Sequence, residues 1–216
     1  MVEKIEDIVP RAEFRAFAVD FGRVVDEIRR RAACSGIKES RELYLVSAAN
    51  DKNNIKIRHN QLDIKQLLGI EQGLERWRPV LKMDFPSPAG EWWAQIFSAL
   101  NVSVPAAAEG EITIETFVDE VLWPHAGIRV AEVFKRRFFF SLQECKVEIT
   151  ELMINRAAIQ TVAVEHVDTA AVLAVQEEVG LSAYENVNYV LALQRIMSLA
   201  PLPSPHWHME QGGNNG

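Results

Sequence analysis

The sequence predicts an α+β fold built on a largely antiparallel sheet or barrel. Segments that alternate apolar and polar residues follow one another along most of the chain, and short polar turns that suit hairpins separate most of them. Helical patterns are confined to one segment after the first strand, a stretch in the middle and the end of the chain. Runs of strands segregated from helices are typical of α+β proteins.

The first half of the chain supplies most of the hairpins. Asp20 is predicted to cap a helix that runs to about Ala33. Pro79 interrupts a later strand and indicates an edge, a bulge or a break, because proline cannot donate to the ladder. Strands are expected at 13–19, 39–47, 55–58, 62–67 and 74–85.

The middle of the chain changes to a helical period. Ser87 and Pro88 predict the N-cap and first residue of a helix to about Asn101. A second helix is expected at 113–121, strands at 128–142, 143–154 and 159–166, and helices at 168–179 and 186–199. The tail 201–216 is rich in proline and glycine and is expected to be disordered, so that 1–200 forms one domain. About eight strands result from this count.

Cations share one face of several expected strands. Period-2 alternation puts Lys135 and Arg137 on the same side of their strand, where like charges repel unless the face meets water or an anion. The same phase is expected for cations on the other strands: Arg15, Lys56, Arg58, Lys65, Arg76, Arg78 and Lys82. The opposite faces are largely apolar.

Two arrangements explain this pattern. An open sheet would bury its apolar face and leave the charged face in water, which is common for antiparallel sheets. A closed barrel with helices outside would instead turn the cations inward, where they make an empty lumen electrostatically unstable and suit a polyanion such as a phosphate chain. Carboxylates on the same faces (Glu13, Asp63, Glu148 and Glu165) could then hold a divalent cation that bridges phosphate oxygens.

Composition excludes several other functions. The net charge of −7 argues against non-specific binding of duplex nucleic acid, although it allows a local cationic pocket. The sequence has no apolar run of about 18 residues, no signal-peptide pattern and neither of the usual glycine-rich nucleotide loops. Cys34 and Cys145 are too few for a disulfide or zinc framework, and we expect both to be buried thiols of a cytoplasmic protein.

Short segments, taken in order, carry a family resemblance: Glu13-Phe14-Arg15-Ala16-Phe17, Ile55-Lys56-Ile57-Arg58, Asp63-Ile64-Lys65, Val133-Phe134-Lys135-Arg136-Arg137, Thr161-Val162-Ala163-Val164-Glu165, and Tyr184-Glu185-Asn186 with Asn188-Tyr189 near the end. Their order resembles that of the CYTH family, the triphosphate tunnel metalloenzymes. Class IV adenylate cyclases, thiamine triphosphatases and inorganic triphosphatases belong to it.

The resemblance implies an antiparallel eight-stranded, tunnel-like β-barrel with helices packed outside. It also implies a metal-dependent phosphohydrolase that acts on inorganic triphosphate or on a nucleoside or other organic triphosphate, with Mg²⁺ or Mn²⁺ and with a homodimer as a further possibility. Catalytic roles fall to Lys65 and Arg137, and metal binding to Glu13, Glu148 and Glu165. Phosphate binding is assigned to Arg15, Lys56, Arg58, Arg76, Arg78, Lys82 and Lys135.

The chain departs from the family pattern at its acidic positions. Arg15 stands where the opening signature has its second Glu, and Phe17 where it has its Lys. Ala163 replaces the first Glu of the late pair, and Arg76 to Pro79 stand where an Arg and an acidic pair are usual. Losing carboxylates weakens metal binding more than anion binding. The alternatives are therefore a catalytically impaired module that binds polyphosphate or an anionic metabolite, or a structural protein on the same scaffold.

Overall fold

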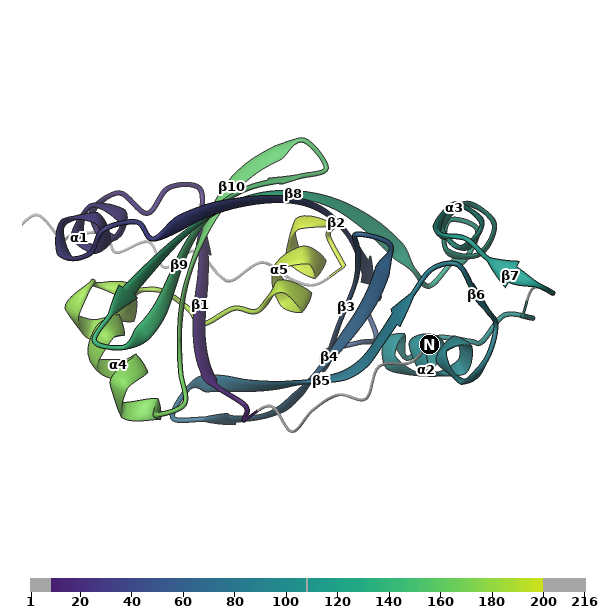
Figure 1. The fold of residues 1–216 in the computed structure, drawn as a ribbon, viewed down its shortest axis with the longest axis horizontal. Coiled ribbons are helices and arrows are strands. Elements are labelled where there is room, and N and C mark those ends of the chain that lie inside the picture. The colour runs from purple at the N-terminus through teal and green to yellow at the C-terminus, as the bar shows by residue number, and fades with distance from the viewer. Residues whose placement is uncertain (1–8, 108, 200–216) are drawn as a thin grey trace, which may run out of the picture.

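Eight antiparallel strands close into a barrel in the computed structural model, which describes residues 9–107 and 109–199 (Figure 1). The order around the barrel is β1-β10-β9-β8-β2-β3-β4-β5, with β5 pairing back to β1. The strands are β1 (Ala12–Ala18), β2 (Gly36–Val46), β3 (Asn53–Arg58), β4 (Gln61–Glu71), β5 (Leu74–Asp84), β8 (Arg129–Leu142), β9 (Cys145–Ile154) and β10 (Ala157–His166). The predicted eight-stranded antiparallel barrel is thus confirmed, and the predicted tail 201–216 lies outside the described residues.

Tight turns set the register of the hairpins. His59 and Asn60 have φ of 50° and 59° between β3 and β4, and Asn155 and Arg156 have φ of 46° and 75° between β9 and β10. Two successive residues with positive φ match the twist of the flanking strands, which is why such turns favour hairpins. These turns join β3 to β4 and β9 to β10.

Helices cover two flanks of the barrel (Figure 1). On one flank α1 (Arg23–Arg31) and α4 (Thr169–Glu178) pack on the outer faces of β1, β8, β9 and β10. On the other flank α2 (Glu91–Leu100), α3 (Ile114–Thr116) and the π-helical turn η1 (Phe117–Leu122) cover β3, β4 and β5. The paired strand segments β6 (Ser87–Pro88) and β7 (Glu111–Ile112) frame that second flank, and the short 3₁₀ turn η2 (Leu181–Ala183) follows α4. The core of the second flank, between α2 and the barrel, buries Trp92, Trp93 and Phe97.

Several predicted helix boundaries are corrected. Ser87-Pro88 pairs with β7 instead of starting a helix, and α2 begins at Glu91 after Gly90. Helix α1 begins after Gly22, whose N–H bonds the Asp20 carboxylate, so Asp20 stabilises the turn before the helix. Asp168 caps α4 as predicted. Cys145 is buried as predicted, but Cys34 is exposed.

The last helix, α5 (Tyr189–Ile196), lies across one end of the barrel, where it is seen within the opening framed by the strands (Figure 1). It begins at Tyr189 and not at the predicted residue 186, because the side chain of Asn188 caps it by accepting from Leu191 N–H. Its Tyr189 and Leu193 pack among apolar residues of the inner faces of the strands: Tyr44, Val46, Ala131, Val133, Leu152 and Ile154. This cluster fills the tunnel at the α5 end.

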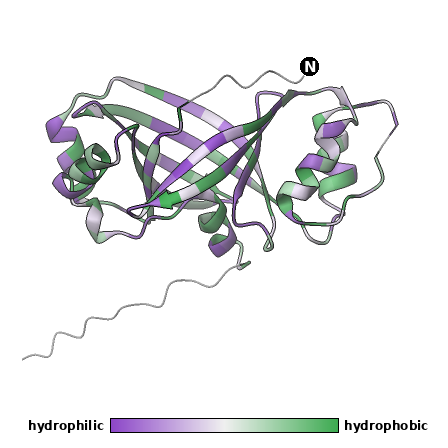
Figure 2. Cartoon of the chain, turned by 90° about the horizontal axis from the view of Figure 1, so that it is seen from below, coloured by the Kyte–Doolittle hydropathy of each residue, from purple (hydrophilic) through white to green (hydrophobic). Residues whose placement is uncertain are grey.

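The strands alternate hydrophilic and hydrophobic residues along their length (Figure 2). Because the apolar side chains meet the flanking helices, the polar alternates face the lumen. Among the described residues, none of the helices is long and apolar enough to cross a membrane.

A bulge in β5 reverses which of its alternate residues face the lumen. Ile64 pairs with Leu81 but Lys65 pairs with Pro79, so Val80 is an extra residue opposite β4. An extra residue in one strand turns the residues beyond it to the opposite faces. Trp77 and Pro79 therefore face the lumen, and Arg76 and Arg78 face outward.

Candidate functional site: a cationic tunnel

A cavity of about 260 Å³ lies inside the barrel. Charged residues reach it from β1, β3, β4, β8, β9 and β10. The cations that line it are Arg15, Lys56, Arg58, Lys65, Lys135, Arg137 and Lys146, and the lining carboxylates are Glu13, Asp63, Glu148 and Glu165. The volume is below the roughly 300–1,000 Å³ of pockets for drug-sized ligands, so the cavity suits a compact, highly charged ligand.

Most of the predicted site residues meet in this cavity. Both predicted catalytic residues, Lys65 and Arg137, line it, as do all three predicted metal ligands. Of the predicted phosphate-binding residues, Arg15, Lys56, Arg58 and Lys135 line it.

Arg76, Arg78 and Lys82 do not line the cavity, and the predicted location of Arg76 and Arg78 in the lumen is corrected. Arg76 donates to Pro10 O and to the Thr169 hydroxyl on the outer side, and Arg78 donates to Gln66. The sequence pattern placed them in phase with Lys82, and the β5 bulge breaks that phase. Lys82 lies opposite the lumen-facing Asp63 in the β4–β5 pairing but is not part of the cavity lining.

Glu42 organises the cations of β3 and β8. Its side chain is fully buried, and its carboxylate lies 3.4 Å from Lys56 Nζ, 3.6 Å from Arg58 Nη1 and 3.2 Å from Lys135 Nζ. The hydroxyls of Ser40 and Tyr44 also donate to it. Burial alone would raise the pKa of Glu42, but the surrounding cations outweigh burial and hold the pKa well below its usual range.

Lys135 lies deepest among the cations. Its Nζ donates to the Tyr44 hydroxyl at 2.6 Å and lies 3.7 Å from the centre of the Tyr189 ring. Tyr44 and Tyr189 stack at 5.3 Å between ring centroids and form an aromatic floor toward the α5 end. Burial lowers the pKa of Lys135 to about 7 although Glu42 opposes the shift. This amine therefore changes charge near neutral pH.

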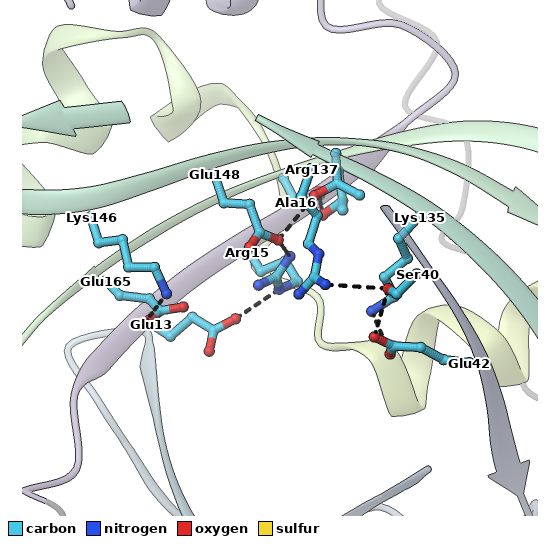
Figure 3. Close-up of polar contacts among 12 residues, drawn as sticks. Glu13, Arg15, Ala16, Ser40, Glu42, Lys135, Arg137, Lys146, Glu148 and Glu165 are labelled. Atoms are coloured by element: carbon cyan, nitrogen blue, oxygen red, sulfur yellow. Dashed lines mark hydrogen bonds and ion pairs between the residues drawn. The ribbon is translucent and has the colours of Figure 1, made fainter. Parts of the chain in front are cut away.

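The predicted metal ligands are each next to a cation (Figure 3). Arg15 Nε donates to Glu13 Oε1 at 2.7 Å, and Arg15 Nη1 lies 3.7 Å from Glu148 Oε1. Glu165 lies 3.7 Å from Lys146 Nζ. Among the described residues no three His, Cys, Asp or Glu side chains gather as a metal site would require. Mg²⁺ needs oxygen ligands around it in octahedral geometry, and a guanidinium between two carboxylates does not fit that requirement.

Several buried donors in the tunnel lack a partner. Arg15 Nη1, Arg137 Nε and the Tyr189 hydroxyl are buried without a hydrogen bond among the described residues. All three residues line the cavity. Arg137 does use another nitrogen, Nη2, to donate to Ser40 (Figure 3). Native proteins rarely leave buried donors unpaired, so these atoms indicate a missing acceptor.

Sequence reasoning missed Glu42, Lys146, Tyr44 and Tyr189. Alternation places Glu42 and Tyr44 on one face of β2, and Lys146 on the same face of its strand as Glu148, but it does not show that Glu42, Tyr44 and Lys146 belong to the site. Tyr189 belongs to the C-terminal stretch of the family resemblance, but alternation could not place it in the lumen, because it reaches the lumen from a helix that lies across the barrel end.

Comparison with known proteins bears on the fold. No family model and no curated sequence matches the chain. HpAC1 from Hippeastrum, a protein with a dominant triphosphatase activity, is 15% identical with a TM-score of 0.50, over 89% of this chain and 98% of its own. PH1012 from Pyrococcus horikoshii is 16% identical with a TM-score of 0.47, over 83% and 97%. The inorganic triphosphatase NE1496 is 14% identical with a TM-score of 0.34, over 77% and 80%. At such identities the likeness shows the fold alone: the chain has a CYTH-like tunnel fold.

Proposed function

We propose that the tunnel binds a compact polyanion of the phosphate-chain class, such as a triphosphate or the end of a polyphosphate, without hydrolysing it. One observation carries the proposal: Arg15, Arg137 and Tyr189 line the same cavity, and each has a buried N–H or O–H donor with no acceptor in the part of the chain that the structure describes. A phosphate oxygen is an acceptor that carries charge, and hydrogen bonds between charged partners are about twice as strong as neutral ones.

The distribution of charge favours a chain over a single small anion. Cations reach the cavity from β3 and β4 on one side and from β1, β8 and β9 on the other. Lys65 and Arg137 come from different walls, so a linear ligand with charge along its length can meet both. Guanidinium groups suit this task because their planar fork matches phosphate oxygens.

Metal-dependent hydrolysis of inorganic triphosphate or of an organic triphosphate is the rival function. In that function Lys65 and Arg137 would stabilise the charge that spreads over the phosphoryl oxygens, and Mg²⁺ or Mn²⁺ on Glu13, Glu148 and Glu165 would supply Lewis-acid chemistry. The cations beside these carboxylates favour binding over hydrolysis.

The test compares tripolyphosphate binding with phosphate release. At a tripolyphosphate concentration about 100 times Kd, we expect the melting temperature to rise by roughly 5–10 °C. The rise should shrink in Lys65→Ala and in Arg137→Ala. Arg78→Ala is the matched control, since it removes a cation from the outer face. We expect no phosphate release from tripolyphosphate or ATP with Mg²⁺ or Mn²⁺.

The other outcomes separate the functions. Phosphate release that needs metal and collapses in Lys65→Ala and Arg137→Ala would establish the hydrolase. If tripolyphosphate causes neither phosphate release nor a rise in melting temperature, the charged lumen is only hydrated and both functions are excluded. A cytoplasmic location and a homodimer stay predictions from the sequence.

A further inference from the structure

Two rows of side chains cross three strands at one side of the tunnel. In the pairing of β1, β10 and β9, Arg15 lies opposite Ala163, which lies opposite Glu148. Two residues along, Glu13 lies opposite Glu165, which lies opposite Lys146. The rows are adjacent on the inner face, so their charges interact directly (Figure 3).

The Arg15 guanidinium bridges the rows. It donates to Glu13 in one row at 2.7 Å and lies 3.7 Å from Glu148 in the other. Ala163, between Arg15 and Glu148, is fully buried and contributes only a methyl group. A small residue opposite a large one leaves the room that the guanidinium needs. Arg15 and Ala163, which both stand where the CYTH pattern has a glutamate, are therefore neighbours across the β1–β10 pair.

The charge of this group is permanent. A guanidinium is not deprotonated in proteins, and its neighbours Glu13 and Glu148 reinforce that state. Burial alone would raise the pKa of Glu148, but Arg15, together with Lys135, Arg137 and a hydrogen bond from Thr150, outweighs burial and lowers that pKa. Arg15 thus neutralises two carboxylates and still has Nη1 buried without a hydrogen bond among the described residues.

We propose that Arg15 is a built-in cation that stands in place of a divalent metal, so that the tunnel binds its anion without metal. The guanidinium lies between Glu13 and Glu148 and bridges them, as a divalent ion would, and its remaining N–H is the donor left for the ligand. This inference rests on the proposed anion binding.

The first test is calorimetric titration of the full-length protein with tripolyphosphate, in EDTA and in Mg²⁺. We expect binding in EDTA and no tightening when Mg²⁺ is added. Binding that appears only with Mg²⁺ would overturn the inference and leave anion binding intact. No binding in either buffer would instead overturn the proposed function.

The second test uses variants at residue 15. Arg15→Gln should bind tripolyphosphate about tenfold to a hundredfold more weakly in EDTA, the usual effect of losing a hydrogen bond to a charged group. Arg78→Gln, with the same change on the outer face, should bind like the parent. Arg15→Glu should lose binding in EDTA and regain part of it in Mg²⁺.

A third measurement on the parent protein keeps the inference testable if these variants fold poorly. Titration of the parent protein with Mn²⁺ alone should show no uptake in the tunnel, since Arg15 and Lys146 already neutralise the carboxylates. Stoichiometric Mn²⁺ uptake by the parent, or parental affinity in a folded Arg15→Gln, would contradict the inference.

Discussion

Glu42 shows how one acidic residue can hold several cations together in an interior. It has no solvent exposure, three cationic neighbours within 4 Å and two hydroxyl donors. Because opposite charges in a poorly solvated site depend on each other, removing one of them leaves the others uncompensated. Glu42 therefore stabilises the empty tunnel and competes with an incoming anion for Lys56, Arg58 and Lys135.

Glu42→Gln keeps the shape of the side chain and removes its charge. We expect the free energy of unfolding to fall by about 3–5 kcal/mol, as for other broken buried pairs, and the affinity for tripolyphosphate to rise. Urea unfolding and calorimetry measure the two effects. Glu39→Gln is the control, since Glu39 pairs with Arg136 at an exposed site and should change stability by less than about 1 kcal/mol. Weaker anion binding in Glu42→Gln would contradict the competition.

Lys135 should make anion binding depend on pH. Its folded pKa of about 7 lies below its ordinary value of 10.5, so the unfolded chain holds more protons between these values and the empty protein gains stability as pH rises through that window. An anion favours the charged amine, so binding should take up protons and weaken as pH rises through 7. The groups that face Lys135 are Glu42, Tyr44, Lys56, Arg15, Glu148 and Tyr189.

Calorimetry with sulfate, in buffers of different ionisation enthalpy, measures this proton uptake. Lys135→Met should abolish it while keeping the length of the side chain. Equal proton uptake by Lys135→Met and by the parent would assign the titration to another group.

At the scale of elements, the weakest part of the barrel wall is the contact between β1 and β5. Only Ala12 with Arg76 and Glu13 with Glu75 pair there. Beyond them the loop before α5 fills the gap. Asn186 accepts from Arg15 N–H at 2.8 Å and donates to Gly73 O at 2.6 Å, and Val187 N–H donates to Arg15 O at 2.7 Å. This loop completes the wall with side-chain and backbone hydrogen bonds in place of a longer strand pair.

Asn186→Ala should therefore lower the free energy of unfolding by about 1–3 kcal/mol, because it leaves an N–H and a carbonyl unpaired. Thermal or urea unfolding measures the loss. Ser182→Ala, an exposed change in η2, should stay within about 0.5 kcal/mol of the parent. A loss no larger than in Ser182→Ala would mean that water replaces both hydrogen bonds.

The same elements show what a sequence can reveal. Alternation in segments such as 55–58 and 128–142 is local, so the strands and most lumen cations were predictable from it. The β5 bulge depends on pairing with β4, and therefore Arg76 and Arg78 were misplaced. The pairing of Arg15 with Glu13 and Glu148 depends on strands far apart in the chain, so the sequence identified these residues as candidates without showing that they neutralise one another.

At the scale of the whole molecule, a net charge of −7 coexists with a cation-lined interior. Acidic residues elsewhere repel extended polyanions, and the barrel wall excludes a duplex from the lumen. We expect duplex DNA to show no binding at physiological salt under conditions where tripolyphosphate binds, and a filter-binding or anisotropy assay checks this. Competition of duplex DNA with tripolyphosphate would place a polyanion site outside the tunnel.

That residues 1–200 form one domain stays a prediction, and pairing of β1 with both β10 and β5 is consistent with it.

Helix α5 and the apolar cluster beneath it fill one end of the tunnel. In the part of the chain that the structure describes, this leaves the opposite mouth as the route for a linear ligand, which then cannot be threaded through. A long polyphosphate should therefore bind by its termini, with the same number of protein molecules on each chain whatever its length. Calorimetry with polyphosphates of defined lengths would show a stoichiometry per chain that stays constant. The amount of protein bound would then depend on the number of polyphosphate chain ends and not on the total amount of phosphate.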